Sequence, residues 1–190
     1  HAPDAKVLCC DPGSISFAGR LNDALATAAT NEVDDAFGKV NHDTIARLLL
    51  TSGSTGSPKA VIMTQRNIIA SGVLWDQVWP FLKQHPPVMV DWLPWNHTAG
   101  AHGPLAMVLR HGGTLYLDDG KPVPKLINRT VTHLRDIKPN IMINVPRGLD
   151  MLVAAMEETP EAAQDIFMNL QIIVYGGAAL TTQTLLKLEQ

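Results

Sequence analysis

Short apolar runs alternate along the chain with longer segments in which apolar residues recur at helical spacing. The short runs predict β-strands, and the segments of helical period predict amphipathic helices. The predicted strands lie at 45–50, 60–63, 88–93, 113–117, 140–145 and 171–176. The predicted helices lie at about 65–79, 100–111, 124–137, 147–158 and 181–190.

Strands that are apolar throughout, separated by amphipathic helices, are typical of a parallel sheet covered on both faces. We therefore expect an α/β fold with a doubly wound, largely parallel sheet and helices on both faces. Thr64 stands where the helix at 65–79 needs an N-cap. The segment at 147–158 places four apolar side chains on one helical face, namely Leu149, Leu152, Val153 and Met156.

The first part of the chain carries the least pattern. A short helix fits around Leu21–Thr30, and the following sequence NEVDDAFGKVNHD is typical of an exposed acidic loop. We expect two parts: a poorly patterned N-terminal segment at 1–44, and an α/β subdomain at 45–190 that carries the chemistry.

Composition narrows the class of protein. The 190 residues are 46% hydrophobic and 17% charged, which is typical of a globular chain, and the formal net charge is −3. No basic stripe or bilayer-length apolar run is present, so we expect neither a nucleic-acid partner nor a membrane span. The two cysteines, Cys9 and Cys10, are adjacent and form no disulfide framework. This favours a reducing, cytoplasmic location.

The sequence TSGSTGSPK at 51–59 separates two predicted strands with glycines, hydroxyl residues and one cation. Glycines permit positive φ, and the turned N–H groups form a concave nest that suits an anion. The spacing is not that of a Walker A loop. Either a surface turn or a polyphosphate-binding loop fits this composition. The predicted phosphate-binding residues are Thr51, Ser52, Gly53, Ser54, Thr55, Gly56 and Lys59.

Polar residues also follow two later strands. His97 lies just beyond the strand at 88–93, close to Trp95. His97 and His102 are spaced five apart, which does not suit two metal ligands on one helical face, so we expect no metal site. Asp118, Asp119 and Lys121 are typical of a solvated turn.

The last predicted strand ends in small residues, namely Gly176, Gly177, Ala178 and Ala179. Residues of this size leave an open shelf that suits a flat ring lying against the backbone. The alternative is a tight turn between a strand and a helix.

The loop closely resembles the phosphate-loop signature of the adenylate-forming enzymes, the acyl-CoA synthetase and luciferase-like superfamily. TSGSTGSPKA matches Thr/Ser-Ser-Gly-Thr/Ser-Thr-Gly-x-Pro-Lys-Gly except that Ala60 replaces the last glycine. The sequence PWNH, ending at His97, matches a Pro-x-x-His element whose histidine lies near the acid's carboxylate and the adenylate phosphate. The small residues at 176–179 match an element that packs against adenine, beside the acyl group.

Three further segments, DWLPWNHT, GGTLYLDDGKP and NVPRGLDML, are similar to the feruloyl-CoA synthetase branch. This likeness implies that Lys121 approaches CoA and that Trp95 lines the acyl pocket, although core packing explains Trp95 equally well. The whole resemblance covers about 45–180.

The resemblance implies an ATP-dependent ligase that activates an aromatic, hydroxycinnamate-like acid as acyl-adenylate, releases pyrophosphate and transfers the acyl group to CoA. Lys59 and His97 are the implied catalytic residues. ATP, CoA and Mg²⁺ are the implied small-molecule partners, with the Mg²⁺ ligands outside this chain.

Family elements for the ribose, and the small C-terminal domain with its catalytic lysine, are absent from these 190 residues. We therefore expect a portion of the large N-terminal domain that does not complete catalysis alone. Two alternatives stay open: a nucleotide-binding or interaction module of a multidomain synthetase without CoA ligase activity, and a different phosphoryl-transfer enzyme.

Overall fold

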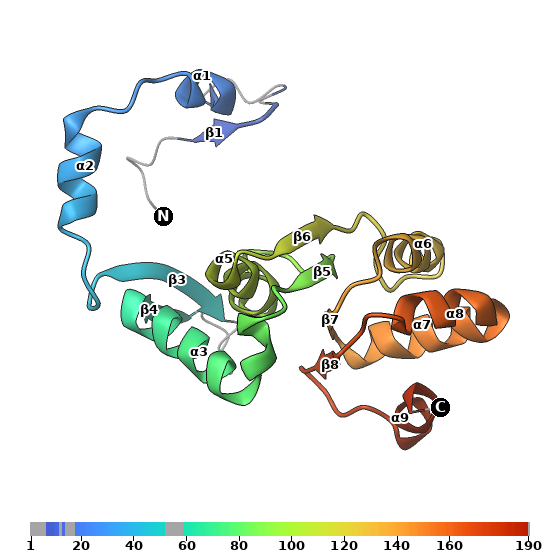
Figure 1. Cartoon of the computed structure of the whole chain (residues 1–190). Coiled ribbons are helices and arrows are strands. Elements are labelled where there is room, and N and C mark those ends of the chain that lie inside the picture. The colour runs from blue at the N-terminus through green and yellow to red at the C-terminus, as the bar shows by residue number, and fades with distance from the viewer. Residues whose placement is uncertain (1–6, 12, 14–17, 52–58, 190) are drawn as a thin grey trace. The chain divides into compact units, whose positions relative to one another are not determined.

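The computed structural model describes residues 7–11, 13, 18–51 and 59–189, with the backbone alone at Thr51. These residues belong to two compact units, His1–Asn41 and His42–Gln190. Figure 1 traces both units from blue to red.

The first unit contains more helix than its sequence pattern predicts. β1 (Leu8–Cys9) and β2 (Gly19–Arg20) pair in parallel. α1 (Leu21–Leu25) is shorter than the predicted helix, and α2 (Asn31–Gly38) replaces the predicted acidic loop, so that expectation was wrong. Acidic residues in the first turn of α2 interact favourably with the N-terminal end of its dipole, which explains why an acidic segment is helical here.

The second unit begins with a hairpin. β3 (Ile45–Thr51) and β4 (Lys59–Thr64) pair antiparallel, with Thr51 opposite Lys59. The loop at 51–59 thus joins an antiparallel pair, whereas the sequence pattern predicted strands of a largely parallel sheet. Residues 52–58 are too few for the crossover that joins parallel strands, whereas a hairpin needs only a short connection.

The two strands of the hairpin are also less buried than their apolar sequences suggest. The exposed fractions of Leu48, Leu50 and Ile62 are 59%, 76% and 58%. α3 (Gln65–Val78) packs against β4. Its N-cap is Thr64, as predicted, and the Thr64 backbone N–H donates to Asn67 Oδ1 at 2.9 Å in a capping box.

The remaining strands form small parallel sheets. β5 (Val88–Asp91) pairs with β6 (Thr114–Leu117), and β7 (Ile141–Asn144) pairs with β8 (Ile172–Tyr175). The Asn140 backbone N–H donates to Val88 O at 3.1 Å, so β5 lies beside β7. The strands therefore lie in the order β6, β5, β7, β8 (Figure 1). The predicted α/β class with parallel strands is confirmed.

Helices follow the strands along the chain. They are η1 (Pro80–Lys83), α4 (Thr98–Gly100), η2 (Ala101–Leu105), α5 (Ala106–His111), α6 (Ile127–Ile137), α7 (Pro146–Glu158), α8 (Pro160–Phe167) and α9 (Thr182–Leu188). Most coincide with the predicted helical segments. α8 was not predicted, because its eight residues are too few to show helical period clearly.

Alternate residues of β5 and β7 point to opposite faces, and each face carries a core. On one face, Val90 and Met142 pack with the apolar sides of α6, α7 and α8. Leu149, Leu152, Val153 and Met156 belong to this core, as the helical pattern predicted. On the other face, Met89 and Ile141 pack with residues of α5 and η1. Helices thus cover both faces of the parallel strands.

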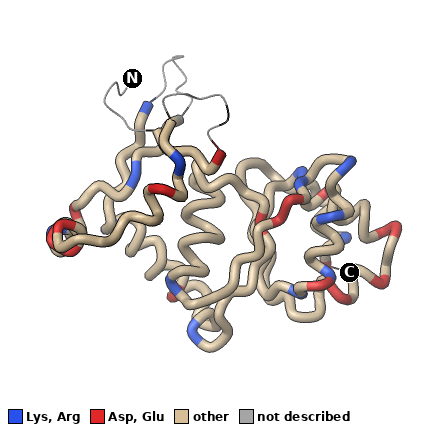
Figure 2. Tube along the Cα trace, turned by 90° about the horizontal axis from the view of Figure 1, so that it is seen from above, with Lys and Arg blue, Asp and Glu red and all other residues tan. Residues whose placement is uncertain are grey.

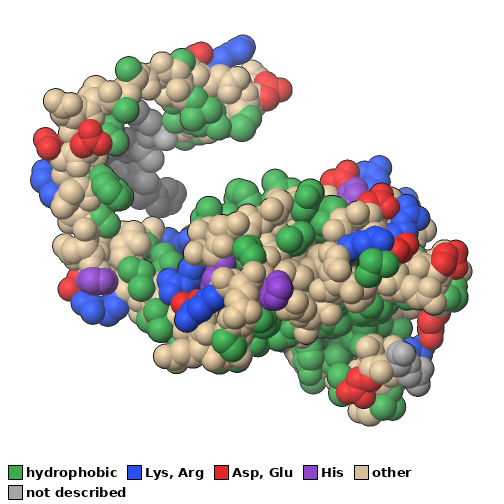
Figure 3. All heavy atoms as spheres, viewed as in Figure 1, with side chains coloured by type: hydrophobic (Ala, Val, Ile, Leu, Met, Phe, Trp, Pro, Cys, Tyr) green, Lys and Arg blue, Asp and Glu red, His purple; other side chains and the backbone are tan. Residues whose placement is uncertain are grey.

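Charges of both signs are interspersed along the trace (Figure 2). Hydrophobic side chains also reach the surface of the second unit (Figure 3). Tyr175 and Leu186 are among the exposed large hydrophobic residues. Among the described residues, we find no helix with the length and apolar character that crossing a bilayer requires.

Candidate active site at the carboxyl ends of the strands

A cavity of about 610 Å³ opens beyond the carboxyl ends of β5, β7 and β8. This is the edge at which parallel α/β sheets bind ligands. Its walls are mainly apolar and come from β4, α3, η2 and the segments that follow the three strands. The chemistry-bearing residues among them are His97, His102, Asn144 and the strand end Tyr175–Gly177.

His97 caps the short helix α4 from an exposed position at this cavity. Its Nδ1 accepts a hydrogen bond from the Ala99 backbone N–H at 3.2 Å. The neutral imidazole therefore carries its proton on Nε2, which remains a donor. His97 is well suited to donate a hydrogen bond to an anionic group.

His102 lies on η2 and reaches the same cavity. Both of its ring nitrogens are buried, and neither has a hydrogen-bond partner among the described residues. Burial lowers the pKa of the imidazole, and the positive charge of Arg47 lowers it further. His102 is thus a neutral polar group in an otherwise apolar wall.

The small residues after β8 divide into two pairs. Gly176 and Gly177 line the cavity, and a Cβ built at either would meet nothing within 4 Å. Gly177 has a φ of +89°, which favours glycine. Ala178 and Ala179 are exposed and are not among the described lining residues. The two glycines thus border open space at the cavity, and their role as a shelf for a flat ring stays a prediction.

The structure describes only the two ends of the predicted phosphate loop. Ser52, Gly53, Ser54, Thr55 and Gly56 lie outside the described residues. Thr51 ends β3, and Lys59 opens β4 directly opposite. Met63, four residues beyond Lys59, lines the cavity, which places Lys59 about 13 Å further along the strand at the usual rise per residue.

Two predicted residues lie elsewhere. Trp95 is half exposed and is not among the described residues that line the cavity. Lys121 is exposed, with a φ of +132°, and its backbone N–H donates to Thr130 Oγ1 at 3.2 Å. Lys121 is likewise not among the described lining residues.

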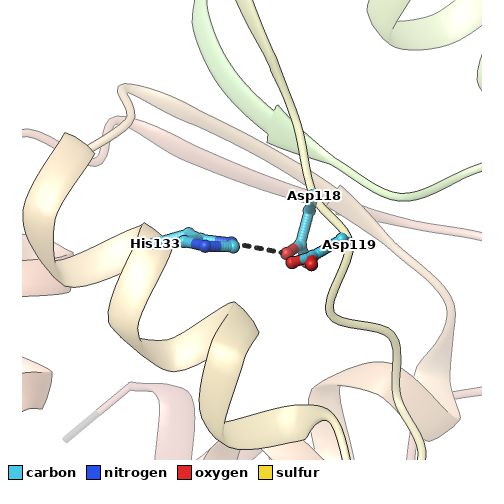
Figure 4. A group of neighbouring side chains, drawn as sticks. All are labelled: Asp118, Asp119 and His133. Carbon is cyan, nitrogen blue, oxygen red and sulfur yellow. Dashed lines mark hydrogen bonds and ion pairs between the residues drawn. The ribbon is translucent and has the colours of Figure 1, made fainter.

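The prediction of a solvated turn at 118–121 was wrong for Asp118, whose side chain is fully buried. His133 Nδ1 lies 2.7 Å from Asp118 Oδ1 (Figure 4). The Thr130 hydroxyl donates to Asp118 Oδ2 at 2.6 Å. The Gly120 backbone N–H donates to the same carboxylate at 2.8 Å. Asp119 remains exposed beside Arg129.

Asp118, Asp119 and His133 present possible metal-ligand atoms within 4.8 Å of one another. The sequence argument, which weighed His97 with His102, did not consider this group. Each oxygen of Asp118 already accepts a hydrogen bond, and Asp119 binds Arg129. The geometry therefore makes this cluster an attachment between β6 and α6.

Asp91 ends β5 and is 4% exposed. Burial raises the pKa of its carboxyl from 3.8 to about 6, against the lowering effect of the Leu93 and Trp92 backbone N–H groups. The Leu93 N–H donates to Oδ1 at 3.2 Å, whereas Oδ2 has no partner among the described residues.

The sequence reasoning missed several residues of the cavity. Asn144 and Tyr175 end β7 and β8. The rule that ligands bind at the carboxyl ends of parallel strands points to both of them. Ser71 and Trp75 are four apart on α3, so they share a face, but no motif marks them.

Comparison with known proteins extends these observations. A sequence model of the family described as AMP-binding enzyme matches residues 3–190. A carboxylic acid reductase from Segniliparus rugosus is 35% identical over 73% of this chain. A long-chain-fatty-acid–CoA ligase from Rattus norvegicus is 26% identical over 73% of this chain. The chain spans 12% and 19% of the lengths of these two relatives.

The fold has a close counterpart in a solved structure. The ATP-bound crystal structure of MatB from Rhodopseudomonas palustris aligns with a TM-score of 0.68 at 22% identity. The alignment covers 90% of this chain and 31% of that one. The family match spans nearly the whole sequence, and the chain belongs to the AMP-binding enzyme family of the adenylate-forming superfamily.

Proposed function

We propose that the chain is a portion of an ATP-dependent acid–CoA ligase that acts on an aromatic, hydroxycinnamate-like carboxylate. The observation that carries this proposal is the cavity at the strand ends, where His97 and the Gly176–Gly177 shelf share one apolar space. An apolar cavity with few polar groups is the usual form of a small-molecule site. The chain spans only 12% and 19% of the lengths of the two relatives, which supports the view that other sequence completes the enzyme.

In the first half-reaction, an oxygen of the acid's carboxylate attacks the α-phosphate of ATP. A new carboxyl–phosphate bond forms as the bond to the β-phosphate oxygen breaks, and pyrophosphate leaves. His97 Nε2–H donates to the carboxylate and holds one oxygen in line for attack. The loop at 51–56 and Lys59 bind the β- and γ-phosphates and stabilise the charge that builds on pyrophosphate.

The acyl-adenylate then occupies the cavity. Its acyl body lies against the apolar walls, and its adenine lies against the Gly176–Gly177 shelf, with Ala178 and Ala179 continuing that surface. Trp95, which is not among the described lining residues, is assigned a place at the exposed mouth of the cavity, beside the acyl group. In the second half-reaction, the thiolate of CoA attacks the acyl carbonyl, the thioester forms and AMP leaves. Lys121 approaches the CoA.

Mg²⁺ prefers carboxylate and water oxygens. No Asp or Glu is among the described residues that line the cavity, so these residues do not fit a Mg²⁺ site. We therefore assign the Mg²⁺ ligands to sequence outside this chain.

A second function is favoured by one comparison. The chain is more similar to the carboxylic acid reductase than to the CoA ligase, at 35% against 26% identity. An adenylating module that passes its acyl group to an acceptor other than CoA would use the same first half-reaction.

Acid-dependent exchange of pyrophosphate into ATP by the complete protein tests the first half-reaction. We expect exchange with hydroxycinnamates, with AMP as the nucleotide product once an acceptor is added. Formation of ADP would instead indicate kinase-like chemistry and contradict the proposal. A thioester formed with CoA favours the ligase, and adenylation without that thioester favours the alternative.

The matched variant is Lys59→Ala. Lys59 is assigned to the departing phosphates and not to the acid. Its loss should therefore slow pyrophosphate exchange at least tenfold, which corresponds to about 1.4 kcal/mol of lost transition-state stabilisation. The dissociation constant of the acid should change less than twofold. Unchanged exchange would remove Lys59 from the mechanism.

A further inference from the structure

We propose that His102 determines specificity at this site by hydrogen bonding a neutral polar substituent of the acid, remote from its carboxylate, such as a phenolic hydroxyl. This inference rests on the proposed function and adds the substrate group that the inner cavity recognises.

The first observation is that His102 lacks partners. Both ring nitrogens are buried and unpaired among the described residues. A buried polar group without a hydrogen bond destabilises the folded protein, so nearly all such groups have a partner. A ligand that occupies the neighbouring cavity would supply it.

The second observation is the position of His102. It lines the cavity of about 610 Å³ and also a smaller one of about 100 Å³. Trp75 lines the same two cavities from α3, and its Nε1–H is likewise buried without a partner. Unpaired donors and acceptors from two separate helices thus border the same space.

The third observation concerns the backbone that carries His102. η2 is a π-helical turn with Pro104 inside it. Proline cannot donate the hydrogen bond of a regular helix, and π-turns occur frequently at functional sites. The wider turn interrupts an otherwise continuous helix from Thr98 to His111 at the point where His102 meets the cavity.

The charge state of His102 limits the group that it can bind. Burial, aided by Arg47, lowers the pKa of the imidazole and keeps it neutral at pH 7. A neutral imidazole offers one donor and one acceptor, which a hydroxyl matches with its own acceptor and donor. Arg110, which lines the smaller cavity together with His102, is already paired with Asp76.

The two histidines therefore divide the recognition of the acid. His97 is exposed and presents Nε2–H, as a carboxylate near ATP requires. His102 has buried nitrogens and meets the part of the acid furthest from solvent. The apolar lining between them fits an aromatic or hydrocarbon body.

The test compares cinnamate with its 2-, 3- and 4-hydroxy derivatives in acid-dependent pyrophosphate exchange by the complete protein. At least one hydroxylated acid should be preferred over cinnamate by about tenfold or more in kcat/KM, as expected for one hydrogen bond to an otherwise unpaired group. His102→Phe, which keeps a flat ring without nitrogens, should reduce this ratio to about one.

Two further variants separate recognition from packing. His102→Asn keeps a donor and an acceptor and should retain part of the preference. Met63→Leu changes an apolar residue of the same cavity and should alter all four acids alike. Circular dichroism of each variant checks that it folds.

The inference fails if no hydroxylated acid is preferred, or if His102→Phe leaves the preference unchanged while exchange proceeds. If no carboxylic acid supports exchange, the proposed function fails, and this inference fails with it. If acids support exchange but the preference among them does not depend on His102, the inference alone fails and the proposed function stands.

Discussion

At the scale of single residues, the site depends on where each histidine places its protons. His97 uses Nδ1 to accept from the Ala99 N–H, so its remaining nitrogen is a donor. His102 uses neither nitrogen within the described residues. The sequence shows that both are histidines near a strand end, but tautomer and burial arise only from the tertiary structure. His97 was predicted as a site residue because PWNH matches the Pro-x-x-His element, whereas no motif marks His102.

Replacing His97 should separate its two roles. His97→Asn provides a side-chain oxygen that can accept the Ala99 N–H, and asparagine is a good N-cap, so folding should be preserved. The shorter asparagine side chain places no donor where His97 Nε2–H lies. We therefore expect the rate of acyl-adenylate formation to fall by about 10²-fold, the usual effect of removing a hydrogen-bond donor that positions the reacting group. Rapid-quench measurement of the adenylate checks this.

His97→Ala is the companion variant. It removes both the cap and the donor, so its adenylate formation should be as slow as that of His97→Asn, and its stability should be lower by about 1 kcal/mol. An unaltered rate in either variant would exclude His97 from the reaction.

The stability of the folded protein should depend on pH through Asp91. Its carboxyl has a folded-state pKa of about 6, above the ordinary 3.8, so the folded protein holds the proton more tightly than the unfolded chain. Stability should therefore decrease as pH rises from about 4 to 6, because ionising the buried carboxyl is unfavourable, and this penalty remains above pH 6. Asp91→Asn should remove it.

Urea unfolding at pH 4 and pH 8 measures the effect. The variant should gain about 2 kcal/mol relative to the unaltered protein between these values, from the size of the pKa change. Asparagine can still accept the Leu93 N–H, so the local turn is kept. A difference in stability that is the same at both pH values would show that Asp91 does not titrate as described.

At the scale of elements, the pattern of the chain predicts the parallel strands and their helices well. β5, β7 and β8 are apolar runs ended by polar or small residues, and both signals are local. The antiparallel pairing of β3 and β4 was not predicted, although a connection as short as residues 52–58 indicates a hairpin.

The attachment of α6 to β6 offers a matched pair of variants (Figure 4). Asp118→Ala leaves the Thr130 hydroxyl and the Gly120 N–H without their buried acceptor, so we expect a loss of about 1–3 kcal/mol in unfolding free energy. Asp119→Ala removes an exposed pair with Arg129 and should cost less than about 1 kcal/mol.

Chemical denaturation of both variants in one buffer gives the comparison. Equal losses for the neighbouring aspartates would contradict the assigned burial of Asp118. A large stabilisation of the unaltered protein by a divalent cation, absent in Asp118→Ala, would instead show that the cluster holds a metal.

At the scale of the whole molecule, three segments that are distant in sequence meet at one edge of the parallel strands. The 93–103 segment, the end of β7 and the end of β8 bring His97, His102, Asn144 and the two glycines to the same cavity. The sequence indicated each segment separately through its strand. The volume of the cavity and the polar groups on its inner wall depend on how α3 and η2 pack, which no local pattern encodes.

The account rests on the claim that this cavity holds the activated acid. A crystal structure of the complete protein with a nonhydrolysable analogue of 4-hydroxycinnamoyl-adenylate tests it most directly. We predict the acyl group inside the cavity, its carbonyl within hydrogen-bond distance of His97 Nε2, and the adenine against Gly176 and Gly177. An analogue bound at another surface, with the cavity left to side chains or solvent, would contradict it.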